Sequence, residues 1–450
     1  MAENKIMVEM ISTEIITPSS PTPPHLKTYL LSSIDQFSQA VYGRVVYFYT
    51  HNIDDANNSG YSSEKKSQQL KKSLSKTLAR FYPFAGRINN NTSVDCNDEG
   101  APYVEAKFNG LLSTFLDQRD NVAVIDQFFP AAIQSPEAGT WPILRVQATF
   151  FDCGGLAVGV CLSHKLCDAR SMSVFMKSWA ETSKGLAQKV VPIFDVASYF
   201  PPGDYHTKLK APPSVGKKAG ESVTKMYVFD KDKIVDLKAK VADTRVQRPS
   251  RVEVVTALIW KIMIAVSRSN GRVLVVPKKT TYFVTQTMDI RKRAEPAMPE
   301  ELVGNLVTII PVETNLDEPE LQDVVAEFRN GVREFGEKKG KRLRGDGALN
   351  VILEVVQGLL ELLGRDDTDG VIFTSLCTFK LYEIADFGWG KPTWVNILPL
   401  PNGAVRKLVT LMDTRDGGVE AWVTMDKEEM ALFECHPQLL QFATHNYSTL

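Results

Sequence analysis

The stretch GLAVGVCLSHKLCDARSMSVFMKSWA, from Gly155 to Ala180, contains the clearest structural pattern in the chain. Its first nine residues, 155–163, are a short apolar run typical of a buried strand. Beyond Asp168, apolar side chains recur at helical spacing, which predicts a helix. The stretch therefore predicts a strand that enters a turn at 164–168 and a helix that leaves it, an α/β arrangement.

Further elements are predicted on the N-terminal side of this stretch. Leu144 to Phe151 forms a second strand, joined to the first through the hairpin turn Asp152-Cys153-Gly154. Residues 64–81 carry apolar side chains at helical spacing and precede Pro83, which predicts an amphipathic helix. Residues 8–16 alternate as a strand that stops at the Pro-rich stretch 17–24.

The C-terminal half repeats the mixture of strands and helices. Asp416-Gly417-Gly418 is a hairpin signal between two alternating segments. The predicted strands are 225–230, 281–289, 405–412 and 419–425, and the predicted helices are 231–242, 251–267 and 427–435.

A Pro-rich segment divides the chain. The 450 residues are enough for two large domains, and 206–220 has few residues able to pack. We expect an N-terminal domain over 1–205, a crossover linker over 206–220 and a C-terminal domain over 221–450.

Composition excludes several classes of partner. The 52 Lys and Arg residues balance 53 Asp and Glu, a net charge of -1, so the chain lacks the basic excess that nucleic-acid binding needs. No apolar run reaches the roughly 18 residues of a membrane helix. The acidic N-terminus lacks the pattern of a secretory signal, so we expect a cytoplasmic protein. The 6 cysteines form no C-x-x-C pair and the histidines no metal-binding pattern, so no metal is expected.

One histidine is a candidate catalytic group. His164 follows an apolar strand, at the position where α/β proteins present reactive groups, and Asp168 lies four residues on. An imidazole can accept and return a proton near neutral pH, so His164 is a candidate general base. A satisfied buried pair or a surface ion pair is the alternative interpretation from the spacing alone.

A second motif lies near the C-terminus. Asp386-Phe387-Gly388-Trp389-Gly390 places two glycines around an indole, which is typical of a tight structural turn. The sequence has neither a Gly-x-Ser-x-Gly elbow nor a phosphate-binding Gly-x-x-x-x-Gly-Lys loop.

Together these motifs resemble the plant BAHD acyl-CoA-dependent acyltransferases. His164 to Asp168 matches the family's His-x-x-x-Asp motif, and Asp386 to Gly390 matches its Asp-Phe-Gly-Trp-Gly motif. Within the family the chain is most similar to the vinorine synthase branch, which acetylates alkaloid and terpenoid alcohols. Supporting matches are residues 30–36, 82–87, 250–253, 257–261, 289–293 and 304–305.

The resemblance implies a fold and a reaction. The fold would be two similar chloramphenicol acetyltransferase-like domains, each a mixed β-sheet with flanking helices, around a solvent channel. His164 would deprotonate the acceptor hydroxyl, which attacks the acyl-CoA thioester directly, with acetyl-CoA as co-substrate and no permanent cofactor. Asp168 would have a geometric role by pairing with Arg291, and the Asp386 loop would support the fold and the CoA side of the channel.

The resemblance also suggests binding residues. Acyl-CoA would contact Ser250, Arg251, Thr374 and Ser375, and for the crossover lysines Lys217 and Lys218 a solvated loop is the alternative. The acceptor pocket would include Asp35 and Leu376.

The chain departs from the family pattern at three places. Leu376 replaces a common Trp of the acceptor pocket, which implies a roomier, more apolar pocket. Ala169 stands where Gly usually follows the motif Asp, as the alkaloid-acylating branch tolerates, and residues 302–305 read Leu-Val-Gly-Asn where Tyr-Phe-Gly-Asn is common.

The expected function is therefore O-acylation of a plant specialised metabolite by a monomeric enzyme. Acylation of an amine and non-catalytic binding on the same fold are the alternatives.

Overall fold

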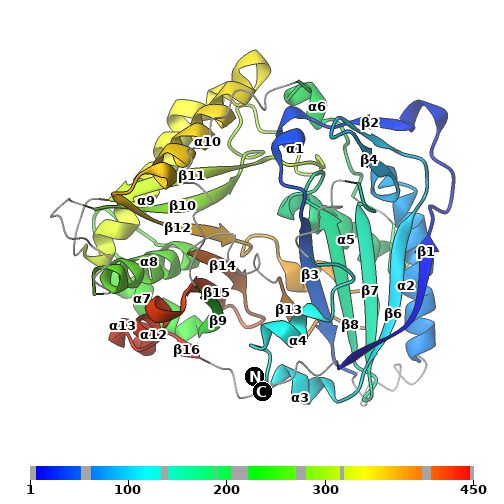
Figure 1. Cartoon of the computed structure of the whole chain (residues 1–450), viewed down its shortest axis with the longest axis horizontal. Helices are drawn as coiled ribbons and strands as arrows, with labels where there is room; N and C mark the ends of the chain where they lie inside the picture. Colours follow the sequence, from blue (N-terminus) through cyan, green and yellow to red (C-terminus); the bar gives the residue numbers. More distant parts are fainter. Residues whose placement is uncertain are drawn as a thin grey trace. The chain divides into compact units, whose positions relative to one another are not determined.

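The computed structural model describes residues 7–51, 62–132, 140–187, 190–203, 221–269, 280–314, 319–397 and 407–445. The chain divides into two compact units (Figure 1). Unit 1 comprises residues 1–204, 299–306 and 379–398, and unit 2 comprises 205–298, 307–378 and 399–450. The predicted linker 206–220 lies outside the described residues.

This division differs from the linear one predicted from the sequence. Two short segments of the C-terminal half, 299–306 and 379–398, belong to unit 1. The second of these carries the Asp386 motif, which the sequence analysis placed in the C-terminal domain. The reason is long-range pairing: the strand Trp394–Asn396 adds to the sheet of unit 1 beside residues 46–48.

Unit 1 is built on a mixed six-stranded sheet in the order β1-β6-β7-β8-β3-β13. The pair β6–β7 is parallel and the other neighbours are antiparallel. A small sheet, β2-β5-β4, accompanies it. The strands are β1 (Val8–Ile16), β2 (Thr28–Leu30), β3 (Tyr42–Tyr49), β4 (Arg87–Asn89), β5 (Ser93–Asp95), β6 (Ala101–Phe108), β7 (Leu144–Phe151), β8 (Leu156–Ser163) and β13 (Trp394–Asn396).

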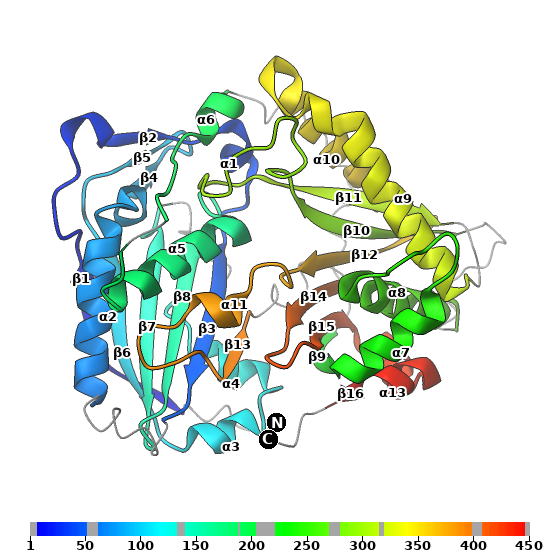
Figure 2. The same ribbon diagram turned by 180° about the vertical axis from the view of Figure 1, so that it is seen from behind.

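Helices α2 (Ser63–Leu78) and α5 (Ala169–Ser183) lie against one face of the large sheet (Figure 2). The apolar residues that predicted α5 are buried, and Trp179 donates its indole N–H to the Ser73 hydroxyl of α2 at 3.0 Å. This contact holds the two helices together. The shorter helices of unit 1 are α1 (Ser33–Phe37), α3 (Leu112–Leu116), α4 (Val122–Asp126), α6 (Val196–Tyr199) and α11 (Leu381–Ile384).

Unit 2 has a mixed seven-stranded sheet in the order β11-β10-β12-β14-β15-β9-β16. The pairs β10–β12 and β12–β14 are parallel. The strands are β9 (Ser222–Phe229), β10 (Thr281–Asp289), β11 (Val307–Thr314), β12 (Thr368–Ser375), β14 (Leu408–Asp413), β15 (Val419–Asp426) and β16 (Thr444–His445). The helices are α7 (Lys231–Val241), α8 (Arg251–Ser269), α9 (Leu321–Lys339), α10 (Ala348–Gly364), α12 (Lys427–Glu434) and α13 (Pro437–Phe442).

Alternate residues of β10 show how helices cover this second sheet. Tyr282 and Val284 join the large apolar core that includes most of α8. Phe283, pointing to the opposite face, packs with Leu359 and Leu362 of α10. The two units therefore confirm the predicted fold class, a mixed sheet with flanking helices in each.

Candidate active site

The candidate base His164 follows strand β8 directly. All eight residues of β8 are buried, because the strand lies between β7 and β3 in the interior of the sheet. The backbone N–H of His164 donates to the carbonyl oxygen of Val41 at 2.8 Å and extends the pairing by one residue. The imidazole is thus attached to a rigid strand end and is partly exposed.

Asn305 holds the imidazole ring from the segment 299–306. Its Nδ2 amide donates to the His164 carbonyl oxygen (2.6 Å) and to Asp35 Oδ1 (3.0 Å). Both partners accept hydrogen bonds, so the amide cannot be reversed without placing oxygen against oxygen. Asn305 Oδ1 consequently faces His164 Nδ1 at 2.9 Å.

This orientation selects the tautomer of His164. Because Asn305 Oδ1 can only accept, the hydrogen of neutral His164 must lie on Nδ1. The lone pair of Nε2 is then available to take a proton. The ring has the protonation pattern that a general base requires.

Asp35 lies beneath Asn305 and is fully buried. The sequence analysis expected Asp35 in the acceptor pocket, but a side chain with no exposed surface cannot line one. Its carboxylate instead caps helix α1 in a reciprocal pair with Ser32 and accepts from the Asn305 backbone at 2.8 Å. The capping sequence Ser32-Ser33-Ile34-Asp35 is a local signal that identifies this role.

Asp168 fixes the other end of the same segment. Its Oδ1 accepts from Ser171 N at 2.8 Å, which caps helix α5, and its Oδ2 accepts from Leu306 N at 3.0 Å. Between them, Gly304 N donates to Ser171 Oγ at 3.0 Å. Three consecutive backbone amides, 304–306, are thus held by Ser171, Asp35 and Asp168.

Gly304 has a φ of 154°, and a Cβ there would lie 2.6 Å from Val196 Cγ2. A side chain at this position would clash with Val196 and strain the backbone next to Asn305. The motif residues Gly304-Asn305, which the sequence analysis noted without a role, are therefore part of the site.

Lys165 was also missed as part of the site. It is buried, and its ammonium donates to the carbonyl oxygens of Gln36 (2.8 Å) and Ser38 (2.7 Å). Burial lowers the pKa of Lys165 to about 8, against an opposing contribution from the Asp35 charge. Its burial and its bonds to residues 36 and 38 place this lysine beneath the site.

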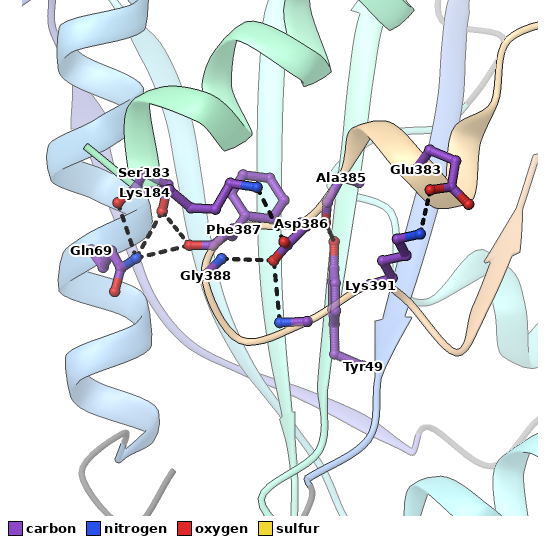
Figure 3. A network of polar contacts seen from close by, with 11 residues as sticks. Tyr49, Gln69, Ser183, Lys184, Glu383, Ala385, Asp386, Phe387, Gly388 and Lys391 are labelled. Atoms are coloured by element: carbon purple, nitrogen blue, oxygen red, sulfur yellow. Dashed lines mark hydrogen bonds and ion pairs between the residues drawn. The ribbon is translucent and has the colours of Figure 1, made fainter. Parts of the chain in front are cut away.

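The Asp386 motif forms a compact turn against the C-terminal end of α5 (Figure 3). Gly388 and Gly390 adopt φ angles of 114° and 100°, which is the tight turn that the sequence predicts. Asp386 accepts from both glycine amides and pairs with Lys184 Nζ at 3.1 Å.

Helix α2 also holds this turn. Gln69 donates to the Phe387 carbonyl oxygen at 2.9 Å, and Ser183 donates to the same oxygen at 2.9 Å. Tyr49 of β3 donates to the carbonyl oxygen of Ala385 at 2.7 Å. The motif therefore joins α2, α5 and β3 within unit 1 (Figure 3).

The remaining predicted site residues belong to unit 2. Arg251 donates to the carbonyl oxygens of Gly417 (2.7 Å) and Gly418 (3.2 Å) and pairs with Asp413 at 2.8 Å, so it stabilises the β14–β15 turn. Ser250 is exposed and accepts from Glu253 N at the start of α8. Arg291 donates to Asp289, and its predicted pairing with Asp168 stays a prediction.

Thr374, Ser375 and Leu376 lie at the C-terminal end of β12 and just beyond it. The Thr374 hydroxyl lies 3.4 Å from that of Thr287, and Leu376 is buried. Their predicted contacts with CoA and with the acceptor stay predictions.

In the described part of the chain, no group of three or more His, Cys, Asp or Glu side chains could hold a metal ion. Among the same residues, no helix is long and apolar enough to cross a membrane.

Comparison with known proteins identifies the family. Residues 6–440 match the model described as "Transferase family", and the chain belongs to this family, whose plant members are the BAHD acyltransferases. It is an acyl-transferring enzyme.

Several relatives match along nearly their whole length. Epi-neemfruitin B 7-O-acetyltransferase of Melia azedarach is 36% identical, covering 97% of this chain and 98% of the relative. Vinorine synthase of Rauvolfia serpentina is 34% identical, covering 98% and 99%.

Solved structures support the same fold. The crystal structure of vinorine synthase matches with a TM-score of 0.82 at 34% identity, covering 98% of this chain and 100% of that one. The TRI101 structure of F. sporotrichioides with coenzyme A and T-2 matches with a TM-score of 0.68, covering 93% and 99%; at 15% identity it shows the fold alone.

Proposed function

We propose that this enzyme transfers an acetyl group from acetyl-CoA to a hydroxyl group of a plant terpenoid or alkaloid, with His164 as general base. The names of the relatives support the donor and acceptor classes: they include a limonoid 7-O-acetyltransferase of Citrus sinensis and a stemmadenine O-acetyltransferase of Catharanthus roseus. The observation that carries the role of His164 is the contact of its Nδ1 with Asn305, which leaves Nε2 free to accept a proton.

The proposed reaction needs one proton to move twice. His164 Nε2 takes the proton of the acceptor hydroxyl as its oxygen attacks the thioester carbonyl. The tetrahedral intermediate then expels the CoA thiolate, and the imidazolium returns the proton to sulfur. General-base assistance of this kind contributes about 10²- to 10⁴-fold.

Acyl-CoA enters the proposal as a co-substrate. Ser250, Arg251, Thr374 and Ser375 stay the proposed contacts to it, and Leu376 stays the proposed contact to the acceptor. Because the Arg251 guanidinium already binds three acceptors of the β14–β15 turn, Ser250 is the more accessible of the two at the start of α8. The monomeric state also stays a prediction.

The test compares His164→Ala with His25→Ala. His25 is an exposed histidine outside the site, so its loss controls for the removal of an imidazole. We expect His164→Ala to lose about 10²- to 10⁴-fold in kcat/KM, measured by thiol release from acetyl-CoA with a panel of terpenoid and alkaloid alcohols. His25→Ala should keep wild-type turnover.

Two outcomes would contradict the proposal. Undiminished turnover in His164→Ala would remove His164 as the base. Turnover with amine acceptors and none with alcohols would replace the proposed reaction with N-acylation.

A further inference from the structure

The Asp35 carboxylate is surrounded by hydrogen-bond donors. Its Oδ1 accepts from the backbone and side-chain nitrogens of Asn305, at 2.8 and 3.0 Å. Its Oδ2 accepts from the backbone nitrogen and hydroxyl of Ser32, at 3.1 and 2.6 Å. Four donors meet two oxygens in a fully buried position, which is the environment of an ionised carboxylate.

The Ser32 hydroxyl supports this assignment. It already accepts from Asp35 N at 3.2 Å, so its own hydrogen points to the carboxylate. The other three partners of the carboxylate are N–H groups. If Asp35 were protonated, none of them could accept its O–H hydrogen.

We propose that Asp35 is a positioning residue for acyl transfer, acting on His164 through the Asn305 amide. Asp35 fixes the orientation of that amide, so that Asn305 Oδ1 accepts the Nδ1 hydrogen of His164 and Nε2 is the reacting nitrogen. Its negative charge, two hydrogen bonds from the ring, stabilises the imidazolium that forms when Nε2 takes the proton. This inference rests on the proposed function, in which His164 is the base.

The arrangement is comparable to a Ser-His-Asp triad with an amide inserted between carboxylate and imidazole. In the triad the carboxylate holds the imidazole in one tautomer and stabilises its charged form. Here the carboxylate lies in helix α1 and the imidazole at the end of strand β8. The segment 304–306 bridges them, and Ser171 and Asp168 hold this bridge from α5.

Among the described residues of unit 1, two other titratable groups interact electrostatically with Asp35: the Lys165 ammonium and the Tyr29 phenol. Burial raises the pKa of Asp35, and its bonds to Ser32 and Asn305 oppose that change. Neither Lys165 nor Tyr29 forms a described hydrogen bond with the Asn305 amide. Of these three groups, Asp35 is therefore the one that is linked to His164 by hydrogen bonds through Asn305.

The test is Asp35→Asn in the full-length chain. An asparagine oxygen can still accept from Asn305, so the substitution removes the charge and preserves the shape. We expect kcat to fall about 10- to 100-fold with little change in the KM for acetyl-CoA. The acidic limb of the pH profile of kcat/KM should move to lower pH by about one unit, because the imidazolium loses a stabilising charge.

The matched control is Ser32→Ala. It removes a donor from the other carboxylate oxygen and weakens the cap of α1, but leaves the contact between Asp35 and Asn305. It should lower the melting temperature without moving the pH profile. The inference would be overturned if the pH profile of kcat/KM shifted equally in Ser32→Ala and Asp35→Asn, or if it did not change in Asp35→Asn. Either result would mean that Asp35 only caps helix α1.

A second readout does not depend on activity. ¹⁵N NMR of histidine-labelled protein, with the His164 signal assigned from His164→Gln, reports which ring nitrogen carries the hydrogen. We expect the Nδ1–H form in the wild type and a mixture of tautomers in Asp35→Asn. Wild-type protein with the Nε2–H form would overturn the inference, whereas the expected tautomers without alcohol acylation would overturn the proposed function alone.

Discussion

The two ends of helix α5 resemble each other in composition and differ in environment. At the N-terminal end, Asp168 caps the helix and binds Leu306, with Lys165 packed beneath. At the C-terminal end, Lys184 pairs with Asp386 and the helix binds the turn around Phe387. Each end therefore contains an acid and a lysine, and at each end the helix holds a segment from far along the chain.

Burial separates the two ends. Lys165 is 6% exposed and Asn305 is fully buried, whereas the polar network at Asp386 lies at the surface. Buried polar groups must satisfy each other completely, which leaves His164 one orientation. Groups at the surface can exchange partners with water. The same residue types thus fix the orientation of His164 at one end and support the fold at the other.

Among the variants that test the two ends of α5, Asn305→Leu should have the largest effect, because it removes the amide that contacts His164. Without an acceptor at Nδ1, the imidazole is free to place its hydrogen on Nε2, and Asp35 loses a donor. We expect kcat/KM to fall at least about 100-fold, measured by thiol release on protein whose melting curve shows a cooperative transition.

Ser171→Ala is the matched control for Asn305→Leu. It loosens the neighbouring residue Gly304 but does not touch the imidazole. A loss of activity as large as that of Asn305→Leu would mean that both residues only hold the segment 304–306.

A smaller difference is expected in the pH dependence of stability at Lys165. Burial lowers its pKa to about 8 in the folded chain, below the ordinary value of 10.5. Between these values the unfolded chain binds more protons, so folding becomes more favourable as the pH rises. Urea unfolding at pH 7.5 to 10.5 should show wild type gaining up to about 3 kcal/mol relative to Lys165→Met.

Lys184→Met tests the same comparison at the exposed end. Because Lys184 is partly exposed in a surface ion pair, we expect Lys184→Met to differ in stability from wild type by less than about 1 kcal/mol, measured by urea unfolding under the same conditions. The wild type could instead gain as much unfolding free energy with rising pH relative to Lys184→Met as it does relative to Lys165→Met. That result would show that the burial of Lys165 does not cause the pH dependence.

Asp386→Asn should have the smallest effect on stability and activity of the variants compared. Its folded pKa is lowered by the Gly388 amide and by Lys184, against the effect of burial. The carboxylate therefore stabilises the fold above its unfolded pKa, and this stabilisation is lost as the pH falls. We expect Asp386→Asn to cost about 1 kcal/mol at pH 7, measured by urea unfolding, with less than a threefold change in kcat.

The cost of Asp386→Asn should shrink as the pH falls below the ordinary carboxyl pKa of about 4, because the unfolded wild-type chain then takes up a proton before the folded chain does. Loss of activity without loss of stability would place Asp386 in the catalytic apparatus and end the contrast between the two ends of α5.

The sequence predicted the parts of this molecule that depend on local pattern. The strand before His164, helix α5 and the β14–β15 hairpin follow from apolar spacing and turn residues. The site required contacts across 130 residues or more, such as Asp35 with Asn305. The spacing of apolar residues along the sequence does not reveal such long-range contacts. The sequence therefore predicted Asp35 in the acceptor pocket and gave no role to Asn305. The Ser32 to Asp35 capping pattern is a local signal for the start of α1, but it carries no information on the distant partner of the carboxylate.

The return of residues 299–306 and 379–398 to unit 1 has a consequence for biosynthesis. A ribosome that has made only the first 204 residues has produced His164 and Asp168 without Asn305 to orient the ring or β13 to complete the sheet. Asn305, which orients His164, is made when about two-thirds of the chain exists, and the segment that carries β13 is made when nearly nine-tenths exists. Until then the edge of β3 that β13 will cover is available to other strands, which makes it the edge that a nascent chain must keep from mispairing.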